Sequence, residues 1–359
     1  MGSGRAGWKY LLPISANSRI LDLGCGWGTL AYGLAHSKCQ VVALDSTLER
    51  MRLLFTRSVQ NGLKNLRTVC AGDGKHLPFS DDTFDIVIVN GVLEWIPSGL
   101  PGDPGELQRG FLKEIRRVLN PSGALLLGIE NRYAWKTWFR NPDGHTGLRF
   151  VPWLPRFLAN MYSKVTGNGE YRNWLYSEKQ YKRLLSHEGF DSSSFVVPLP
   201  GYHHPVWMVP LTQPKKIAQR VRRSVRSPVK KTLQHVKGRL TAMFPDAFTI
   251  IASSENAKPN FLDRLLRHLN ELDISGWENI PQEYADYRIN GEMGIVSILL
   301  QKNGSGNVIK LPLHSRAVIE LEHEVTFFQQ SPKQLSNLLP RVISKGNFDA
   351  QEYFVYSFS

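Results

Sequence analysis

Short apolar runs alternate with longer segments of helical periodicity in the first 130 residues of the chain. The β-branched and aliphatic runs predict strands at 19–23, 40–44, 66–71, 84–90 and 124–129. Residues 106–119 predict a helix, because Phe111, Leu112 and Ile115 share one face with Leu107 and Val118. Strands that alternate with helices in this way are typical of βα units around a parallel sheet.

A second group of elements ends this part of the chain. Ser177 and Gln180 have the spacing of a capping box, which predicts the start of a helix that ends at Gly189. The runs 194–199 and 206–211 predict an antiparallel hairpin at the edge of the sheet. Residues 1–212 are therefore predicted to form one α/β domain, a Rossmann-like parallel sheet with an antiparallel edge hairpin.

Residues 131–176 interrupt this domain with little periodicity and hold eleven aromatic side chains in 46 positions. A segment of this length inside a compact domain is often a lid or a binding loop. The alternative, that the aromatic residues pack a small subdomain, has equal weight.

The charge of the chain is concentrated in one segment. The formal net charge is +13, and residues 213–240 contain ten Lys or Arg and no Asp or Glu. Apolar residues recur there at spacings of three or four, interrupted by Pro228, which indicates a basic amphipathic linker. The linker either packs its apolar edge on a neighbouring domain or lies on an anionic membrane surface. Because the charge is local rather than spread around a cleft, a nucleic-acid partner is not expected.

Residues 241–359 have a different pattern and predict a smaller α+β segment. The runs 295–301 and 307–311 predict a β-hairpin, and 317–329 predict a helix.

Several protein classes are excluded by composition. No window has the roughly 18 consecutive apolar residues of a spanning helix, and the N-terminus lacks the apolar stretch of a signal peptide. Cys25, Cys39 and Cys70 have no metal-ligand spacing, so no metal site is expected. We expect a cytoplasmic protein, in contact with the inner face of the membrane if the basic linker binds lipid.

A glycine loop follows the first predicted strand. Gly24, Gly26 and Gly28 alternate with Cys25 and Trp27 before a predicted helix, an arrangement that lets a ligand approach the backbone. The dinucleotide fingerprint places its third glycine at position 29, where this chain has Thr29. Asp22 would also repel a pyrophosphate, so an NAD-dependent oxidoreductase is disfavoured.

The loop and the segments after it resemble class I S-adenosylmethionine-dependent methyltransferases. The stretch 20–29 resembles motif I of that family, 41–45 its second strand, 71–74 the loop after its third strand, and 77–87 the small-molecule methyltransferase pattern before its fourth strand. The resemblance implies S-adenosylmethionine as cofactor, with Asp45 on the ribose, Asp73 on the adenine and 90–94 lining the pocket. The cofactor-binding residues that it implies are Asp22, Gly24, Cys25, Gly26, Trp27, Gly28, Asp45, Ser46, Asp73, Gly74, Asn90 and Gly91.

An oxygen or nitrogen acceptor must also lose a proton during methyl transfer. The candidates for this role are His145, Tyr133 and Glu130, in and beside the aromatic insertion. The stretches 129–133 and 143–147 resemble an insertion of bacterial methyltransferases linked to cell-surface polysaccharide production. That resemblance implies a small-molecule, glycan or lipid-linked acceptor; a quinone, a lipid or RNA as acceptor are the alternatives.

The C-terminal segment resembles the N-terminal lobe of aminoglycoside phosphotransferases and kinases. In that resemblance Lys310 is the phosphate-binding lysine, Glu324 is its helix partner and Glu322 is the alternative partner. Residues 352–359 resemble the strand before a kinase hinge. Either the chain is a fragment of a longer bifunctional protein or this resemblance is false, and in both cases we expect these residues alone to transfer no phosphate.

Overall fold

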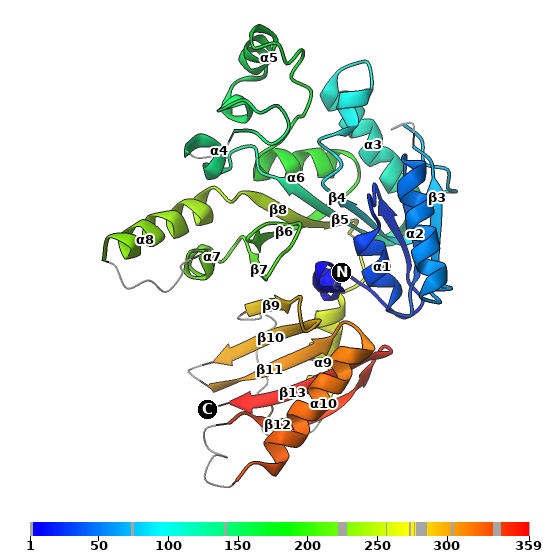
Figure 1. Ribbon diagram of the computed structural model, residues 1–359, viewed down its shortest axis with the longest axis vertical. Coiled ribbons are helices and arrows are strands. Elements are labelled where there is room, and N and C mark those ends of the chain that lie inside the picture. The colour runs from blue at the N-terminus through cyan, green and yellow to red at the C-terminus, as the bar shows by residue number, and fades with distance from the viewer. Residues whose placement is uncertain are drawn as a thin grey trace.

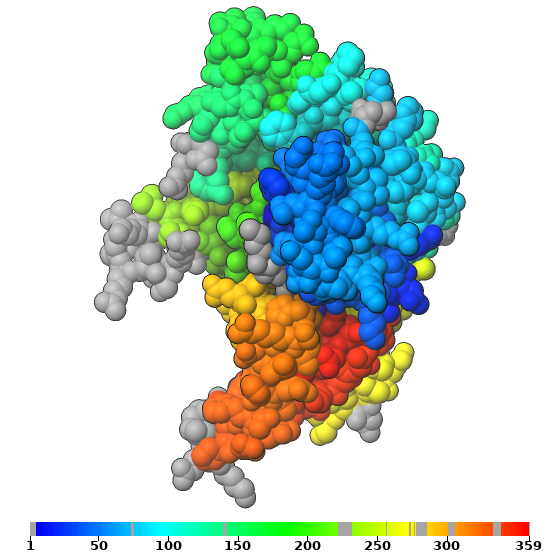
Figure 2. Space-filling model, turned by 45° about the vertical axis from the view of Figure 1, so that its right-hand side comes forward, coloured from blue at the N-terminus to red at the C-terminus, as the bar shows by residue number. Residues whose placement is uncertain are grey.

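The computed structural model describes residues 3–72, 75–139, 142–221, 228–255, 257–272, 274–275, 277, 286–302, 305–332 and 339–358. Within these residues one continuous sheet of thirteen strands has the order β12-β13-β11-β10-β9-β7-β6-β8-β5-β4-β1-β2-β3. Figure 1 shows two lobes along this sheet, with the N-terminus between them. We call them the upper lobe, which ends with β8, and the lower lobe, which begins with α9. In Figure 2 the orange and red surface of the lower lobe meets the blue N-terminal part of the upper lobe.

The strands and helices have the following bounds. The strands of the upper lobe are β1 (Arg19–Leu23), β2 (Gln40–Asp45), β3 (Leu66–Cys70), β4 (Phe84–Asn90), β5 (Leu119–Glu130), β6 (Ser192–Leu199), β7 (Trp207–Pro210) and β8 (Ala247–Ser253). Its helices are η1 (Ser3–Leu11), α1 (Thr29–Ala35), α2 (Leu48–Gln60), η2 (Ile96–Gly99), α3 (Pro104–Val118), α4 (Trp135–Phe139), η3 (Val151–Trp153), α5 (Arg156–Val165), α6 (Glu178–His187), α7 (Pro214–Val221) and α8 (Pro228–Met243). The lower lobe contains α9 (Phe261–Glu271), β9 (Asp286–Asn290), β10 (Ile295–Lys302), β11 (Ser305–Pro312), α10 (Ser315–Gln330), β12 (Arg341–Phe348) and β13 (Gln351–Phe358).

The five N-terminal strands form a parallel sheet in the order β3-β2-β1-β4-β5, which confirms the predicted fold class. Alternate residues of each strand enter opposite cores, because strand side chains point to the two faces in turn. Ile20 and Ile88 pack on the face covered by η1 and α1. Leu21 and Val89 pack on the other face with α3 and α6. Both faces of the parallel sheet are therefore buried by helices.

The upper lobe takes one strand from beyond the basic linker. β8 lies between β5 and β6 and is antiparallel to both. The predicted boundary at residue 240 assigns this strand to the C-terminal segment, and the structure corrects that assignment. The predicted hairpin of β6 and β7 does form, but β8 separates it from β5.

The capping box and the helix after it are confirmed. The Ser177 hydroxyl accepts from the Gln180 backbone, and the Gln180 side chain accepts from the Ser177 backbone. Gly189 follows α6 with a φ of +84°, a left-handed conformation that glycine adopts without strain.

The basic linker forms two helices, and Pro228 begins the second. Ile217 of α7 is fully buried against β6 and β7. Gly238 lets α8 cross α7 closely, since a Cβ there would lie 2.6 Å from the Ala218 carbonyl oxygen. This part of the linker therefore packs on the neighbouring domain. Leu233 and Val236 of α8 remain exposed, and a membrane-surface contact through them stays a prediction.

The aromatic insertion is in part a small subdomain. Val151, Ala159 and Tyr171 form its buried core. Arg172 ties it to the parallel domain by donating to the carbonyl oxygens of Pro97 and Leu100 at 2.8 and 2.7 Å. The alternative that the insertion packs a small subdomain is thus correct for Tyr171.

The lower lobe is an antiparallel sheet, and its β10–β11 hairpin and helix α10 confirm the predicted elements. η1 is buried between the two lobes. The Tyr10 hydroxyl donates to Pro312 at 2.8 Å, and the Tyr287 hydroxyl donates to Gly7 at 2.6 Å. Within the part of the chain that the structure describes, no helix is long and apolar enough to cross a membrane.

Candidate active site

A cavity of about 600 Å³ lies at the carboxyl ends of β1, β2 and β4. Ligands of α/β proteins bind at this end of the parallel strands. Its lining residues include Leu23, Gly24, Leu44, Asp45, Ser46, Arg50, Ala71, Gly72, Lys75, His76, Leu77, Gly91, Val92, Trp95, Ile96 and Phe111.

The glycine loop forms the wall of this cavity next to β1 and β2. The backbone amides of Gly24 and Cys25 both donate to the Leu44 carbonyl oxygen, at 2.8 and 3.0 Å, so the loop is fixed to the end of β2. Gly24 has a φ of +69°, and a Cβ there would lie 2.5 Å from the Val92 side chain. Only glycine therefore fits at this position without displacement of the cavity wall.

The other loop residues have separate roles. A Cβ at Gly26 would meet no atom within 4 Å, so the loop is open to a ligand at that point. Gly28 begins α1, and a Cβ there would lie 2.3 Å from Leu54 on α2. The Trp27 ring is exposed, and the Arg50 guanidinium lies over it at 5.7 Å. Gly28 thus serves helix packing, while Gly24 and Gly26 serve the approach of a ligand.

Asp22 lies behind the loop and is almost completely buried. One carboxylate oxygen accepts from the Ala31 backbone amide at 2.9 Å, at the N-terminal turn of α1. Burial raises the pKa of Asp22 to about 7, against the lowering effects of the Ala31 amide and of Arg5. A cationic ligand near this side chain would favour its ionised form.

Asp45 ends β2 and lines the cavity beside Ser46. Its carboxylate accepts from the backbone amides of Gly26 and Thr47, each at 2.9 Å. Arg50 of α2 forms an ion pair with it at 3.5 Å. Asp45 therefore joins the glycine loop to the start of α2, on the wall where the resemblance places the ribose.

The remaining predicted cofactor residues differ in position. Asp73 and Gly74 lie outside the described residues. Gly91 lines the cavity, whereas the Asn90 side chain lies against Gly128 of β5, where a Cβ would be 1.9 Å from the Asn90 amide oxygen. Sequence reasoning missed Trp95 and Ile96 in the apolar wall, because their segment has no distinctive motif, and it placed Phe111 on a helix face without linking it to the cavity.

A buried polar cluster lies beside the cavity. His145 Nε2 is 3.7 Å from Glu130 Oε2, and the Tyr202 hydroxyl donates to Glu130 Oε1 at 2.8 Å. Glu94 is fully buried next to them. One ligand atom from each of Glu94, Glu130 and His145 lies within 4.8 Å of the others, a geometry that can hold a divalent cation.

Burial and contacts within the cluster shift the pKa values of Glu94, Glu130 and His145. Burial and the neighbouring Glu130 carboxylate raise the pKa of Glu94 well above its ordinary range. The pKa of Glu130 is lowered, because His145 and Tyr202 stabilise its charge more than burial opposes it. The pKa of His145 is raised by Glu130, although burial acts in the opposite direction. Glu130 therefore keeps its charge more readily than Glu94, and it lies between Tyr202 and His145.

Two contacts connect the cluster to the cavity. Trp95 lines the cavity and packs edge-on against the His145 ring, with ring centroids 4.7 Å apart. Gly91 also lines the cavity, and a Cβ there would lie 3.1 Å from the Tyr202 hydroxyl, so this hydroxyl lies directly behind Gly91. Two of the three predicted catalytic residues, Glu130 and His145, are thus brought together.

The third, Tyr133, is not part of this cluster. Its ring packs against Trp153 at 5.0 Å and against the Arg132 guanidinium at 5.3 Å. Tyr202 takes the position of a hydroxyl next to Glu130 instead. It comes from the turn between β6 and β7, where no pattern distinguished it from an ordinary hairpin residue.

The lower lobe contains the predicted lysine and glutamate pair. Lys310 of β11 forms an ion pair with Glu324 of α10, and its ammonium lies 4.7 Å from the centre of the Tyr356 ring. Glu322, the alternative partner, pairs with Lys345 at 3.1 Å.

Comparison with known proteins supports the methyltransferase assignment. Residues 14–180 match a family model described as a methyltransferase domain. The chain is 27% identical to a demethylmenaquinone methyltransferase of Lactiplantibacillus plantarum, over 51% of this chain and 75% of that protein. It is 28% identical to a ubiquinone biosynthesis O-methyltransferase of Bartonella tribocorum, over 46% of this chain and 60% of that protein.

Among solved structures, a methyltransferase of Methanosarcina mazei described as SAM-dependent aligns with a TM-score of 0.41 and 20% identity, over 67% of this chain and 94% of that one. The residues at the cavity fit S-adenosylmethionine, because a loop that only glycine can form faces an acidic strand end. Together with the matched family model and the relatives, this supports an S-adenosylmethionine-dependent methyltransferase domain in residues 14–180.

Proposed function

We propose that the chain methylates a hydroxyl group of a small sugar or sugar-lipid acceptor, and that Glu130 and His145 remove the proton of that hydroxyl. The observation that carries the proposal is the cluster of Glu94, Glu130, His145 and Tyr202, which lies behind Gly91 and Trp95 of the cofactor cavity. The choice of a sugar rests on the resemblance of 129–133 and 143–147 to the insertion of polysaccharide-linked methyltransferases.

S-adenosylmethionine supplies an activated methyl group when bound, so the protein must align the acceptor and handle its proton. The tautomer of His145 that donates from Nε2 towards Glu130 leaves Nδ1 as the proton acceptor. Nδ1 is buried and has no hydrogen-bond partner among the described residues. The acceptor hydroxyl loses its proton to Nδ1, and the Glu130 carboxylate stabilises the resulting imidazolium.

His145 and Tyr202 stabilise the ionised form of Glu130, and the Tyr202 hydroxyl donates to one of its oxygens. Glu94, whose pKa is raised by burial and by Glu130, is buried beside them. Trp95 is half exposed between the cavity and His145. Its ring offers the kind of flat apolar face on which a sugar ring packs.

The test is a screen of glycan, lipid and quinone acceptors with mass detection of the added methyl group, followed by variants on the acceptor that reacts. We expect Glu130→Gln and His145→Gln to lower kcat by about a hundredfold while the affinity for S-adenosylmethionine is unchanged. Exposed matched controls are Glu178→Gln and His187→Gln at the two ends of α6.

The pH dependence separates a proton-transfer role from a structural one. Glu130→Gln should lower the pKa of His145 and move the acidic limb of the rate profile to lower pH. Rates equal to those of the control variants would contradict the base assignment. Methylation of a quinone or lipid alone would contradict the sugar assignment. A rate that vanishes with chelation and returns with a divalent cation would show that Glu94, Glu130 and His145 bind metal instead.

A second function is favoured by the lower lobe. We propose that the lower lobe binds nucleotide phosphates through Lys310, as the resemblance to a kinase N-terminal lobe implies. The Lys310–Glu324 ion pair between β11 and α10 supports it. Calorimetry with ADP should show affinity in the wild type and in Lys345→Met, and a loss of at least about tenfold in Lys310→Met. Equal affinities in both variants would refute it.

A further inference from the structure

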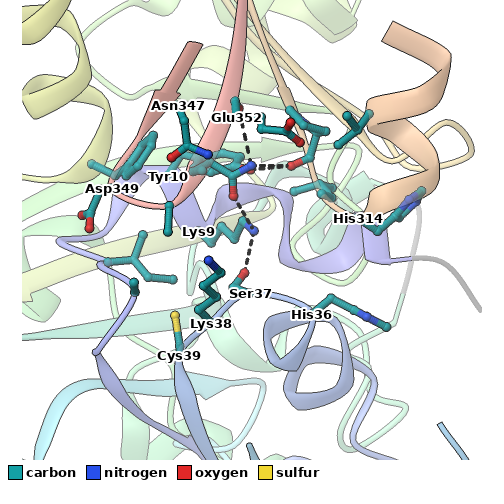
Figure 3. Close-up of a pocket in the computed structure, with 18 of the residues that line it drawn as sticks. Lys9, Tyr10, His36, Ser37, Lys38, Cys39, His314, Asn347, Asp349 and Glu352 are labelled. Carbon is teal, nitrogen blue, oxygen red and sulfur yellow. Dashed lines mark hydrogen bonds between the residues drawn. The ribbon is translucent and has the colours of Figure 1, made fainter. Parts of the chain in front are cut away.

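A second cavity, of about 460 Å³, lies where the two lobes meet (Figure 3). It is bounded by η1, the end of α1, the start of α10 and the turn between β12 and β13. Four basic side chains line it, Lys9, His36, Lys38 and His314, against the two acidic side chains of Asp349 and Glu352. The wall between them is apolar and contains Tyr10, Ile14, Phe261 and Ile319.

Lys9 is a buried cation without an acidic partner. Only 3% of the residue is exposed. Its ammonium donates to Ser37 Oγ at 2.8 Å and to Gln351 Oε1 at 3.5 Å, and both acceptors are neutral (Figure 3). No described carboxylate forms an ion pair with it, and burial lowers the pKa of Lys9 to about 8. The ammonium also lies 4.9 Å from the centre of the Tyr10 ring, and none of these neutral contacts supplies a full counter-charge.

Among the described residues, no ion pair joins Lys9 to Glu352, and the other nearby acceptors are occupied elsewhere. Asp349 forms an ion pair with Arg264 at 2.8 Å. The carbonyl oxygens of Ala35, Ser37 and Cys39 at the end of α1 accept from the Asn65 amide. Neither group is therefore the counter-charge of Lys9.

The positive end of a helix dipole also faces this cavity. His314, Ser315 and Val318 of the first turn of α10 line it, and His314 Nδ1 caps the helix by accepting from Ala317 at 3.1 Å. The partial positive charge of a helix N-terminus favours an anion. Burial lowers the pKa of His36, and His314 and Lys9 lower it further, which places these basic groups near one another.

We propose that this cavity binds a small organic phosphate, with the phosphoryl group on the Lys9 ammonium and the Ser37 hydroxyl and the organic part on the apolar wall. A dianionic phosphate supplies the negative counter-charge that the Lys9 ammonium lacks. Because Lys9 and Ser37 belong to the upper lobe and Gln351 and Ser315 to the lower lobe, the ligand holds the two lobes together. The site is separate from the cofactor cavity and from Lys310, and the inference does not depend on the proposed acceptor.

The test titrates inorganic phosphate and pyrophosphate into the full chain by calorimetry, with S-adenosylhomocysteine present at saturation to occupy the cofactor cavity. We expect both anions to bind to the wild type and to Lys310→Met. Lys9→Met removes the charge at similar size and should weaken both by about tenfold or more. Lys113→Met on the exposed face of α3 is the matched control and should bind as the wild type does.

Ser37→Ala provides a second variant if Lys9→Met does not fold as judged by circular dichroism, and it should weaken phosphate binding without loss of structure. Binding that is equal in Lys9→Met, Ser37→Ala and Lys113→Met would overturn the proposal. So would the absence of binding of either anion to the wild type. A negative result for phosphate binding would not bear on the proposed methyl transfer, because Lys9, Ser37 and Lys113 do not line the cofactor cavity.

Discussion

Replacement of Asp22 by asparagine tests the electrostatic cost of a buried carboxyl group behind the glycine loop. The pKa of Asp22 is about 7 in the folded chain and 3.8 in the unfolded reference. Below about pH 4 the group is protonated in both states and has no effect on stability. As the pH rises towards 7, the unfolded chain ionises while the folded chain retains its proton, so folding becomes progressively less favourable.

The size of this effect follows from the two pKa values. Their difference corresponds to about 4 kcal/mol, lost between about pH 4 and pH 7 and constant above that range. The asparagine side chain can still accept from the Ala31 amide but has no proton to lose. We therefore expect Asp22→Asn to be more stable than the wild type at neutral pH by up to about 4 kcal/mol, with no difference near pH 4.

The assay is urea denaturation of the cofactor-free protein across this pH range, analysed as the difference between variant and wild type. Asp191→Asn, at an exposed position before β6, is the control. A difference between Asp22→Asn and wild type that does not change with pH would refute the reasoning. S-adenosylmethionine should reverse the order, because its positive charge favours an ionised Asp22 and gains no such interaction from the neutral amide of the variant.

Three further variants test other parts of the upper lobe. Asp45→Asn should weaken S-adenosylmethionine binding about tenfold by calorimetry; unchanged affinity would exclude Asp45 from the cofactor site. Gly28→Ala should destabilise the chain by about 2–3 kcal/mol, since its φ is +69° and its Cβ would meet Leu54; a wild-type urea midpoint would contradict this. Ser177→Ala should cost about 1 kcal/mol through the lost cap of α6, and Ser193→Ala, which caps no helix, should cost less.

The parallel strands could be predicted because each is a local apolar run between turn residues. β1 and β4 have the predicted bounds, and β2 and β3 differ by one residue at one end. β5 begins five residues earlier than predicted, because residues 119–123 are part of the strand in the structure. Local pattern thus identified all five strands and misplaced only the start of β5 by more than one residue.

β8 shows where local pattern is insufficient. The run 247–253 has no feature that links it to β5 rather than to the segment that follows it. Its place depends on the two strand edges that need a partner, Ala124–Glu130 on one side and β6 on the other. Pairing between distant segments is determined by the whole domain, and a single sequence does not contain it as a pattern.

Some residues of the candidate site could be predicted from the sequence, and others could not. Glu130 and His145 were found because each has a side chain suited to proton transfer. Glu94 and Tyr202 complete their environment from separate segments, and only the fold brings all four together. Tyr133 failed as a member because three residues after a strand end the chain has already turned towards Trp153.

The insertion of β8 between β5 and β6 has a consequence for synthesis on the ribosome. The strands β1–β7 emerge first, but the sheet keeps two unpaired edges until the chain has passed α7 and α8 and delivered β8. Open strand edges invite pairing with other chains. A nascent chain stalled after α7 should therefore be a target for chaperones, and a gene fragment cut at the basic linker should give an insoluble product even though it encodes the entire glycine loop.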